Sequence, residues 1–211
     1  MKTVLFLAAA CALAAQDARL TFQKVFPGSV PAWVKITLER NGQGVYTEAA
    51  DDPQPIQFRL PEADTAAMFA LAEKLGYFSR TLESGLPVAK MGDKILRYEA
   101  AGKSAEQKFN YTQDPDAQAL ADWFERISET ERYLVDLEQA ARFDKLGVNR
   151  IILLIQAAHE KKRLVATDQY LKWLDRIAKN ESYLNMARER AARLADTFRN
   201  PAPPASEGTK Q

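Results

Sequence analysis

Few side chains in this sequence are of the types that carry out catalysis or bind metals, and His159 is the only histidine. The run His159-Glu160-Lys161-Lys162-Arg163 begins like the zincin motif His-Glu-x-x-His, but an arginine stands at the second ligand position. Cysteine and histidine are the usual zinc ligands, and the sequence has only one of each. We therefore predict no metal site, and we interpret this basic run as the C-terminal end of a helix.

Nucleophile and carboxylate motifs are also incomplete. Ser84 lies in Glu83-Ser84-Gly85, which lacks the first glycine of the Gly-x-Ser-x-Gly elbow. Acidic residues occur close together at 51–52 and at 114–116, and a glycosidase needs two carboxylates that face a sugar across a cleft. The sequence does not place these carboxylates in space. We predict no catalytic residue, and a hydrolase that acts on envelope glycan or peptide through paired carboxylates stays as an alternative.

Nucleotide and calcium motifs fail in the same way. Gly42-Gln43-Gly44 lacks a third glycine and precedes a strand pattern, so it predicts a hairpin turn rather than a phosphate-binding loop. The series Asp114-Pro115-Asp116 is interrupted by alanine and glutamine before it can form an EF-hand. It is typical of a helix start instead, with Asp as N-cap and Pro at the first helical position. We predict no cofactor.

Aromatic residues are a weaker indication of binding. They are frequent in the strand-rich first part of the sequence, where most are expected to pack in the core or on a sheet face. A sheet covered by one helix leaves its other face partly open. We name four aromatic residues as a candidate surface platform for a carbohydrate or peptide: Trp33, Tyr46, Tyr98 and Tyr111.

The first fifteen residues have the layout of an export signal. Lys2 is followed by a short apolar run and by alanines up to Ala15, and cleavage is expected after Ala14 or Ala15. The apolar run is shorter than the ~20 residues that a transmembrane helix needs. Cys11, the only cysteine, would be removed with this segment, which leaves a mature protein without disulfides. The alternative is a lipid anchor at Cys11, although Leu7 stands one place too far upstream for that motif. We predict export to the periplasm or the extracellular space.

Charge is balanced along the sequence. After removal of residues 1–15, the sequence has 28 basic and 28 acidic residues. Divided at Asp114, the two parts have 12 of each and 16 of each. Proteins that hold nucleic acid normally have a basic excess, so we predict no nucleic-acid partner.

The elements that position these residues indicate an α+β protein. Alternating and turn patterns predict an antiparallel sheet with one helix over residues 16–113. Residues 114–199 show helical periodicity interrupted by short links, which predicts about four antiparallel helices. Residues 200–211 contain three prolines and no large apolar residue, and we expect them to be disordered. The expected strands cover 20–26, 33–40, 45–49, 56–60, 88–91, 94–98 and 106–111, and the expected helix of the sheet part covers 61–75.

One segment resembles a known class of domain. Pro31-Ala32-Trp33, an alternating strand, Asn41-Gly42 and then Val45-Tyr46 follow one another as in small exported bacterial domains of unknown function. The resemblance covers about the first third of the mature protein, and Val30 stands where some of these domains have a cysteine. It implies a bacterial envelope protein without an assigned activity, and it implies no functional residue.

These observations together predict a non-catalytic, exported binding protein. Its partner would be another protein or an envelope polymer. Besides the hydrolase, a small-ligand carrier is an alternative, and it would need a closed apolar pocket between the sheet and the helices.

Overall fold

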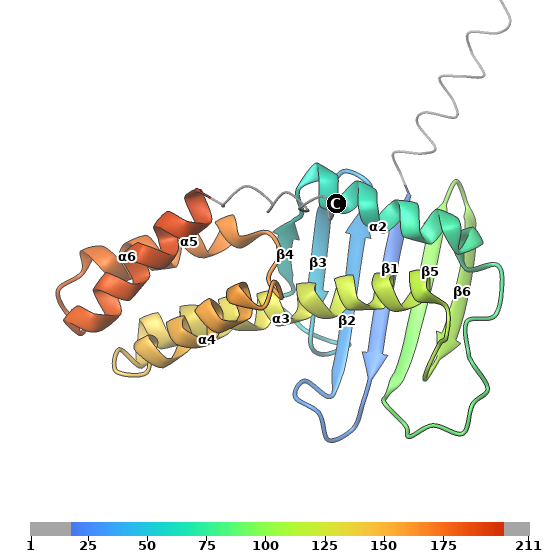
Figure 1. Cartoon of the computed structure of the whole chain (residues 1–211), viewed down its shortest axis with the longest axis horizontal. Helices are drawn as coiled ribbons and strands as arrows, with labels where there is room; N and C mark the ends of the chain where they lie inside the picture. Colours follow the sequence, from blue (N-terminus) through green and yellow to red (C-terminus); the bar gives the residue numbers. More distant parts are fainter. Residues whose placement is uncertain (1–17, 201–211) are drawn as a thin grey trace, which may run out of the picture. The chain divides into compact units, whose positions relative to one another are not determined.

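The computed structural model describes residues 18–200 and confirms the α+β class. A six-stranded antiparallel sheet is followed by a helical region (Figure 1). The protein divides into two compact units, one ending at Glu131 and the other beginning at Arg132. We call them the sheet unit and the helical unit. Predictions for Cys11, Ala14, Ala15 and residues 201–211 lie outside the described residues.

The sheet has the strand order β4-β3-β2-β1-β5-β6. The central strand β1 therefore pairs with β2 on one side and with β5 on the other. Helix α2 lies between β4 and β5 in the sequence, so it connects the two halves of the sheet. The strands are β1 (Arg19–Val25), β2 (Trp33–Glu39), β3 (Gln43–Thr47), β4 (Ile56–Arg59), β5 (Asp93–Ala100) and β6 (Lys103–Phe109).

Alternation along the strands gives the sheet an apolar inner face and a mainly polar outer face. On the inner face, Phe22 lies opposite Ile36 on one neighbour and Leu96 on the other, and all three side chains are buried. On the outer face, Arg19 lies between Glu39 and Glu99. The alternating pattern seen in the sequence therefore corresponds to two faces with different roles.

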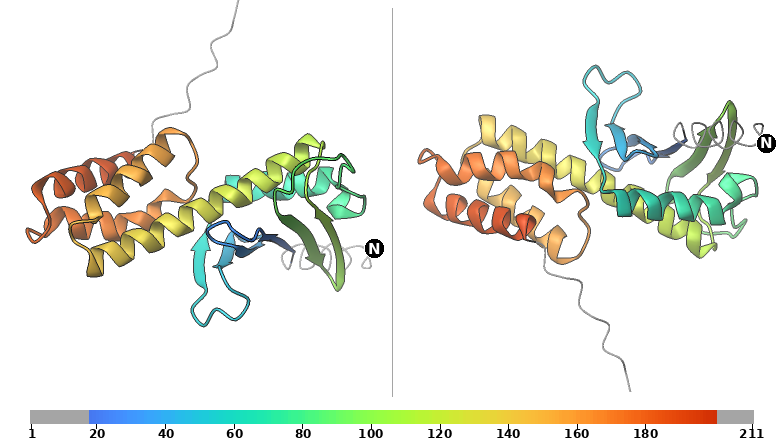
Figure 2. Two further views of the ribbon diagram at one scale, coloured as in Figure 1. Left: turned by 90° about the horizontal axis from the view of Figure 1, so that it is seen from below. Right: turned by 90° about the horizontal axis from the view of Figure 1, so that it is seen from above.

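Two helices cross the inner face, where one was predicted (Figure 1, Figure 2). Helix α2 (Glu62–Lys74) is the expected one. The second is the first part of α3 (Pro115–Phe143), whose Phe124 ring stacks on Phe22 with ring centres 5.1 Å apart. Glu125 of the same helix pairs with Lys24 of β1 at 3.0 Å. The prediction of a boundary at residue 114 differs from this division, because this part of α3 belongs to the sheet unit.

The predicted strand at 88–91 is wrong. Residues 79–92 form a loop without regular structure. The side chain of Asn110 satisfies backbone groups of this loop that a neighbouring strand would otherwise pair with. It accepts a hydrogen bond from the Met91 N–H (2.7 Å) and donates one to the Ala89 carbonyl (3.1 Å). Pro87, which has no N–H to donate to a ladder, lies just before this segment.

The helical unit contains the end of α3 and the helices that follow it. They are α4 (Val148–Glu160), the short 3₁₀ helix η2 (Thr167–Tyr170), α5 (Leu171–Lys179) and α6 (Asn185–Arg199). Their apolar faces form one core around Ile152, Tyr170 and Leu174, each fully buried. The prediction of about four helices is confirmed. None of the helices in the described part is long and apolar enough to span a membrane.

Candidate functional site: an arginine-lined hollow at one end of the sheet

The sheet unit has an open hollow of about 1080 Å³ at the end where β1 begins and β2 and β5 finish. The turn between β2 and β3 and the turn between β5 and β6 border it. Four basic residues and two acidic residues belong to its lining. The described lining residues are Arg19, Glu39, Arg40, Asn41, Arg97, Glu99, Ala100, Ala101, Gly102, Lys103 and Ser104.

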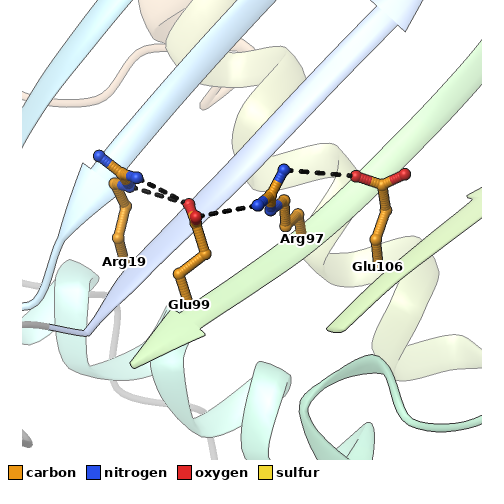
Figure 3. Close-up of polar contacts among 4 residues, drawn as sticks. All are labelled: Arg19, Arg97, Glu99 and Glu106. Carbon is orange, nitrogen blue, oxygen red and sulfur yellow. Dashed lines mark hydrogen bonds and ion pairs between the residues drawn. The ribbon is translucent and has the colours of Figure 1, made fainter. Parts of the chain in front are cut away.

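A row of charges lies on the outer face of the sheet (Figure 3), and three of its four residues, Arg19, Arg97 and Glu99, line the hollow. Arg19 donates two hydrogen bonds to one oxygen of Glu99, from Nε at 3.1 Å and from Nη2 at 2.8 Å. Arg97 donates to the other oxygen at 3.1 Å, and it lies 4.0 Å from Glu106. Strand register produces this row, because Arg19 is directly opposite Glu99 and Arg97 is directly opposite Glu106.

These neighbours favour the ionised form of Glu99. Burial acts to raise the pKa of its carboxyl group, but the hydrogen bonds from Arg19 and the charges of Arg19, Arg97 and Lys35 outweigh burial. The net effect lowers the pKa of Glu99 below its ordinary value. Glu99 is therefore a carboxylate held between two guanidinium groups.

Two further cations of the lining, Arg40 and Lys103, have no ion pair with any residue in the range 18–200. The guanidinium of Arg40 lies 5.0 Å from the centre of the Phe69 ring, which positions it without neutralising its charge. Lys103 begins β6 and is exposed. These two side chains give the hollow positive charge that is available to a ligand.

Both turns at the border use backbone conformations with positive φ. Gly42 has φ +86°, and a Cβ atom there would lie 2.6 Å from the carbonyl oxygen of Leu60. The predicted hairpin turn at 41–44 is thus confirmed, with Asn41 Oδ1 accepting the Gln43 N–H at 2.8 Å. In the other turn, Ala101 has φ +48° and Gly102 has φ +75°. Alanine adopts this conformation at a cost, so the border of the hollow contains a strained residue.

The predicted aromatic platform does not form among the described residues. Tyr46 is only 1 % exposed, because it points into the core of the sheet unit. Trp33 pairs with Val25 on the outer face, whereas Tyr98 pairs with Leu20 on the inner face. Tyr111 follows β6 in a separate segment. Inner and outer positions alternate with period two, and the platform combined residues of both kinds.

Tyr98 contacts an aromatic residue that was not part of the predicted platform. Its ring stacks on Tyr77 with centres 4.3 Å apart. Tyr77 lies in the 3₁₀ turn η1 (Gly76–Phe78), in which all three residues have positive φ. Burial, together with Tyr77, raises the pKa of Tyr98, and Arg40 opposes this increase.

The other sequence candidates have structural surroundings. His159 lies in the last turn of α4, and its ring meets that of Phe198 at 5.0 Å. Ser84 donates to Glu83, its neighbour in the sequence. Asp114 accepts hydrogen bonds from the N–H groups of Asp116 and Ala117, as expected of an N-cap. Within residues 18–200, no cluster of three or more His, Cys, Asp or Glu residues could hold a metal ion.

Sequence reasoning missed the residues of the hollow. Arg97 and Glu99 alternate on one strand, which places both on the same face. That Arg19 completes the row depends on the pairing of β1 with β5, and Arg19 and Glu99 are 80 residues apart in the sequence. Such pairing has no local signal in the sequence.

No protein-family model matches the sequence, and neither the curated proteins nor the solved structures include a significant match. The resemblance to small exported domains therefore stays a prediction.

Proposed function

We propose that this protein is a non-catalytic, exported binding protein, and that its hollow holds an anionic group of a protein or an envelope polymer. The observation that supports this is the surplus of cations in the lining, four basic side chains against two acidic ones. Arg40 and Lys103 carry the surplus, since Arg19 and Arg97 share Glu99.

Carboxylate is the anionic group that best suits this lining. A guanidinium has five N–H donors in a planar fork that matches the two oxygens of a carboxylate. Arg19 uses two of its donors and Arg97 uses one on Glu99, so both retain donors for a second anion. Glu99 itself illustrates how the site holds a carboxylate. We therefore expect acidic side chains, the terminal carboxylate of a polypeptide or an acidic sugar as the bound group.

The lining supports neither alternative function. A hydrolase needs a carboxyl group with a raised pKa as its general acid, and Glu99 has a lowered pKa. A carrier needs a closed apolar pocket, and this hollow is open and charged.

Opposite changes of charge in the hollow test the proposal. The probe is a fluorescent oligoglutamate peptide, titrated at low and at moderate salt. The double variant Arg40→Gln/Lys103→Gln should weaken binding by about tenfold, because one charge-assisted hydrogen bond contributes ~1.5 kcal/mol. Glu99→Gln should strengthen binding, because it removes the internal carboxylate that competes for Arg19 and Arg97.

Arg59→Gln is the matched control, since this exposed arginine on β4 does not line the hollow. Equal losses in all variants would refute the proposal. If only the double variant loses binding, cross-linking in cells and mass spectrometry of the envelope proteins would identify the natural partner. The partner would be cross-linked to the wild type and lost in the double variant.

A further inference from the structure

The helical unit carries a basic charge that the sequence analysis did not reveal. Its described residues, 132–200, include 14 basic and 9 acidic residues, a net charge of +5 with His159 neutral. The described part of the sheet unit, 18–131, has 13 basic and 17 acidic residues, a net charge of −4. The division at residue 114 hid this difference, because residues 114–131 carry six acids and one base.

Two links lie together at one end of the helical unit (Figure 2). One joins α3 to α4 over residues 144–147, and the other joins α5 to α6 over residues 180–184. Tyr183 connects them, since its hydroxyl donates to the Ala141 carbonyl at 2.7 Å and its ring lies 5.8 Å from Lys145 Nζ. The first link is tightly wound, with the Gly147 N–H donating to Asp144 Oδ1 at 3.0 Å.

Large apolar side chains protrude from this end. Phe143 is 84 % exposed and Leu146 is 75 % exposed. Leu184 and Met186, at the second link and the start of α6, are also about half exposed. The helices have an apolar core of their own, so these side chains are surplus to it. We call Phe143, Leu146, Leu184 and Met186 the apolar tip.

Cations surround the apolar tip. Residues 138–150 and 179–188 contain five basic residues, of which Lys145 and Arg150 lie in and next to the α3–α4 link. The same segments contain three acids. Glu138 pairs with Arg142, so four basic residues remain against two acids, Asp144 and Glu181. The surroundings of the tip are therefore positively charged.

We propose that this end of the helical unit docks on an anionic lipid surface. Bulky, exposed apolar side chains at the links between helices enter the boundary between headgroups and acyl chains, and neighbouring Lys and Arg side chains bind anionic headgroups. An acidic protein would satisfy the charge. A protein interface, however, buries its apolar anchors in well-packed pockets, whereas Phe143 and Leu146 stand at the end of a helix hairpin. The proposal is independent of the hollow in the sheet unit.

Vesicle sedimentation tests it. All variants are compared in the same form of the protein, with the N-terminus established by intact mass. Vesicles consist of phosphatidylcholine alone or mixed with phosphatidylglycerol. We expect the protein to sediment with the mixed vesicles and to dissociate as salt is raised. Phe143→Ser/Leu146→Ser should weaken this binding by ~tenfold or more, because it removes two inserted apolar side chains. Lys145→Gln/Arg150→Gln should weaken binding and reduce its salt dependence.

Val30→Ser is the matched control. Val30 is 78 % exposed but belongs to the sheet unit, so this variant should bind as the wild type does. Absence of binding to mixed vesicles, or an equal loss with Val30→Ser, would overturn the proposal. Loss of a cross-linked protein from Phe143→Ser/Leu146→Ser, without vesicle binding by either form, would show instead that the tip binds a protein.

Discussion

Glu99 is the residue that sets the charge balance of the hollow. Its pKa lies below the ordinary value of 4.5 because of Arg19 and Arg97, despite burial. A lowered pKa means that this carboxylate stabilises the fold above its unfolded-state pKa. The contribution is lost as pH falls through the lowered pKa of the folded state.

A carbon-detected titration of the Glu99 carboxyl group checks this pKa. Its midpoint should lie below 4.5, and Arg19→Gln should move it upward. The stability difference between the wild type and Glu99→Gln should shrink below that midpoint. A midpoint at or above the ordinary glutamate value would contradict the ion-pair geometry.

Ala101 offers a second test at the scale of one residue. It is exposed, has φ +48° and forms a two-residue turn together with Gly102. Asn-Gly is preferred over Ala-Gly in such turns, because asparagine adopts positive φ more easily. Ala101→Asn should therefore raise the free energy of unfolding by up to ~1 kcal/mol in urea titrations. The same change at Ala89, an exposed loop residue without positive φ, should have little effect.

Among the elements, α3 depends most clearly on one side chain at its start. Asp114 Oδ1 accepts the N–H groups of Asp116 and Ala117 at 3.0 and 3.3 Å, and Oδ2 accepts from Arg80 at 2.5 Å. Asp114→Ala should lower the free energy of unfolding by about 1–2 kcal/mol. Asp114→Asn keeps the cap acceptor and should cost less. If the two variants lose the same stability, the Arg80 ion pair rather than the cap would be the main contribution.

Local sequence patterns predicted most strands and helices, because these elements form from residues that are close together in the sequence. Alternation and turn residues in 33–47 fix a hairpin within fifteen residues of sequence, and β2 and β3 are found there. The segment 88–91 is as apolar as a strand, but no strand within residues 18–200 pairs with it. The charge row of the hollow needed the pairing of Arg19 with Glu99, which only the assembled sheet defines.

At the scale of the whole molecule, the two units have separate cores. Ile152 is fully buried in the helical unit, and Ile36 is fully buried in the sheet unit. Ile152→Ala should cost about 2–5 kcal/mol and raise amide exchange mainly in residues 132–200. Ile36→Ala should affect mainly the strands. Equal changes in both regions from either variant would show that the protein unfolds as a single cooperative unit.

The boundary between the units was hidden because α3 is continuous. Its helical pattern runs from Pro115 to Phe143 without a break, so the sequence offers no sign of a change near Glu131. The acidic residues in the first half of α3 belong to the sheet unit. The basic excess of the helical unit is therefore seen only once the structure defines the boundary.

The open sheet has a last consequence, which concerns contact between copies of the protein. Strands β4 and β6 end the sheet on its two sides, and an uncovered strand is a template on which further strands can stack. β4 has only four residues and lies between Pro55 and Pro61, while β6 carries Lys103, Glu106 and Lys108. Short length, flanking prolines and alternating charge all oppose such stacking. We therefore expect concentrated solutions of the protein to resist association through these two edge strands, which light scattering at rising concentration would check.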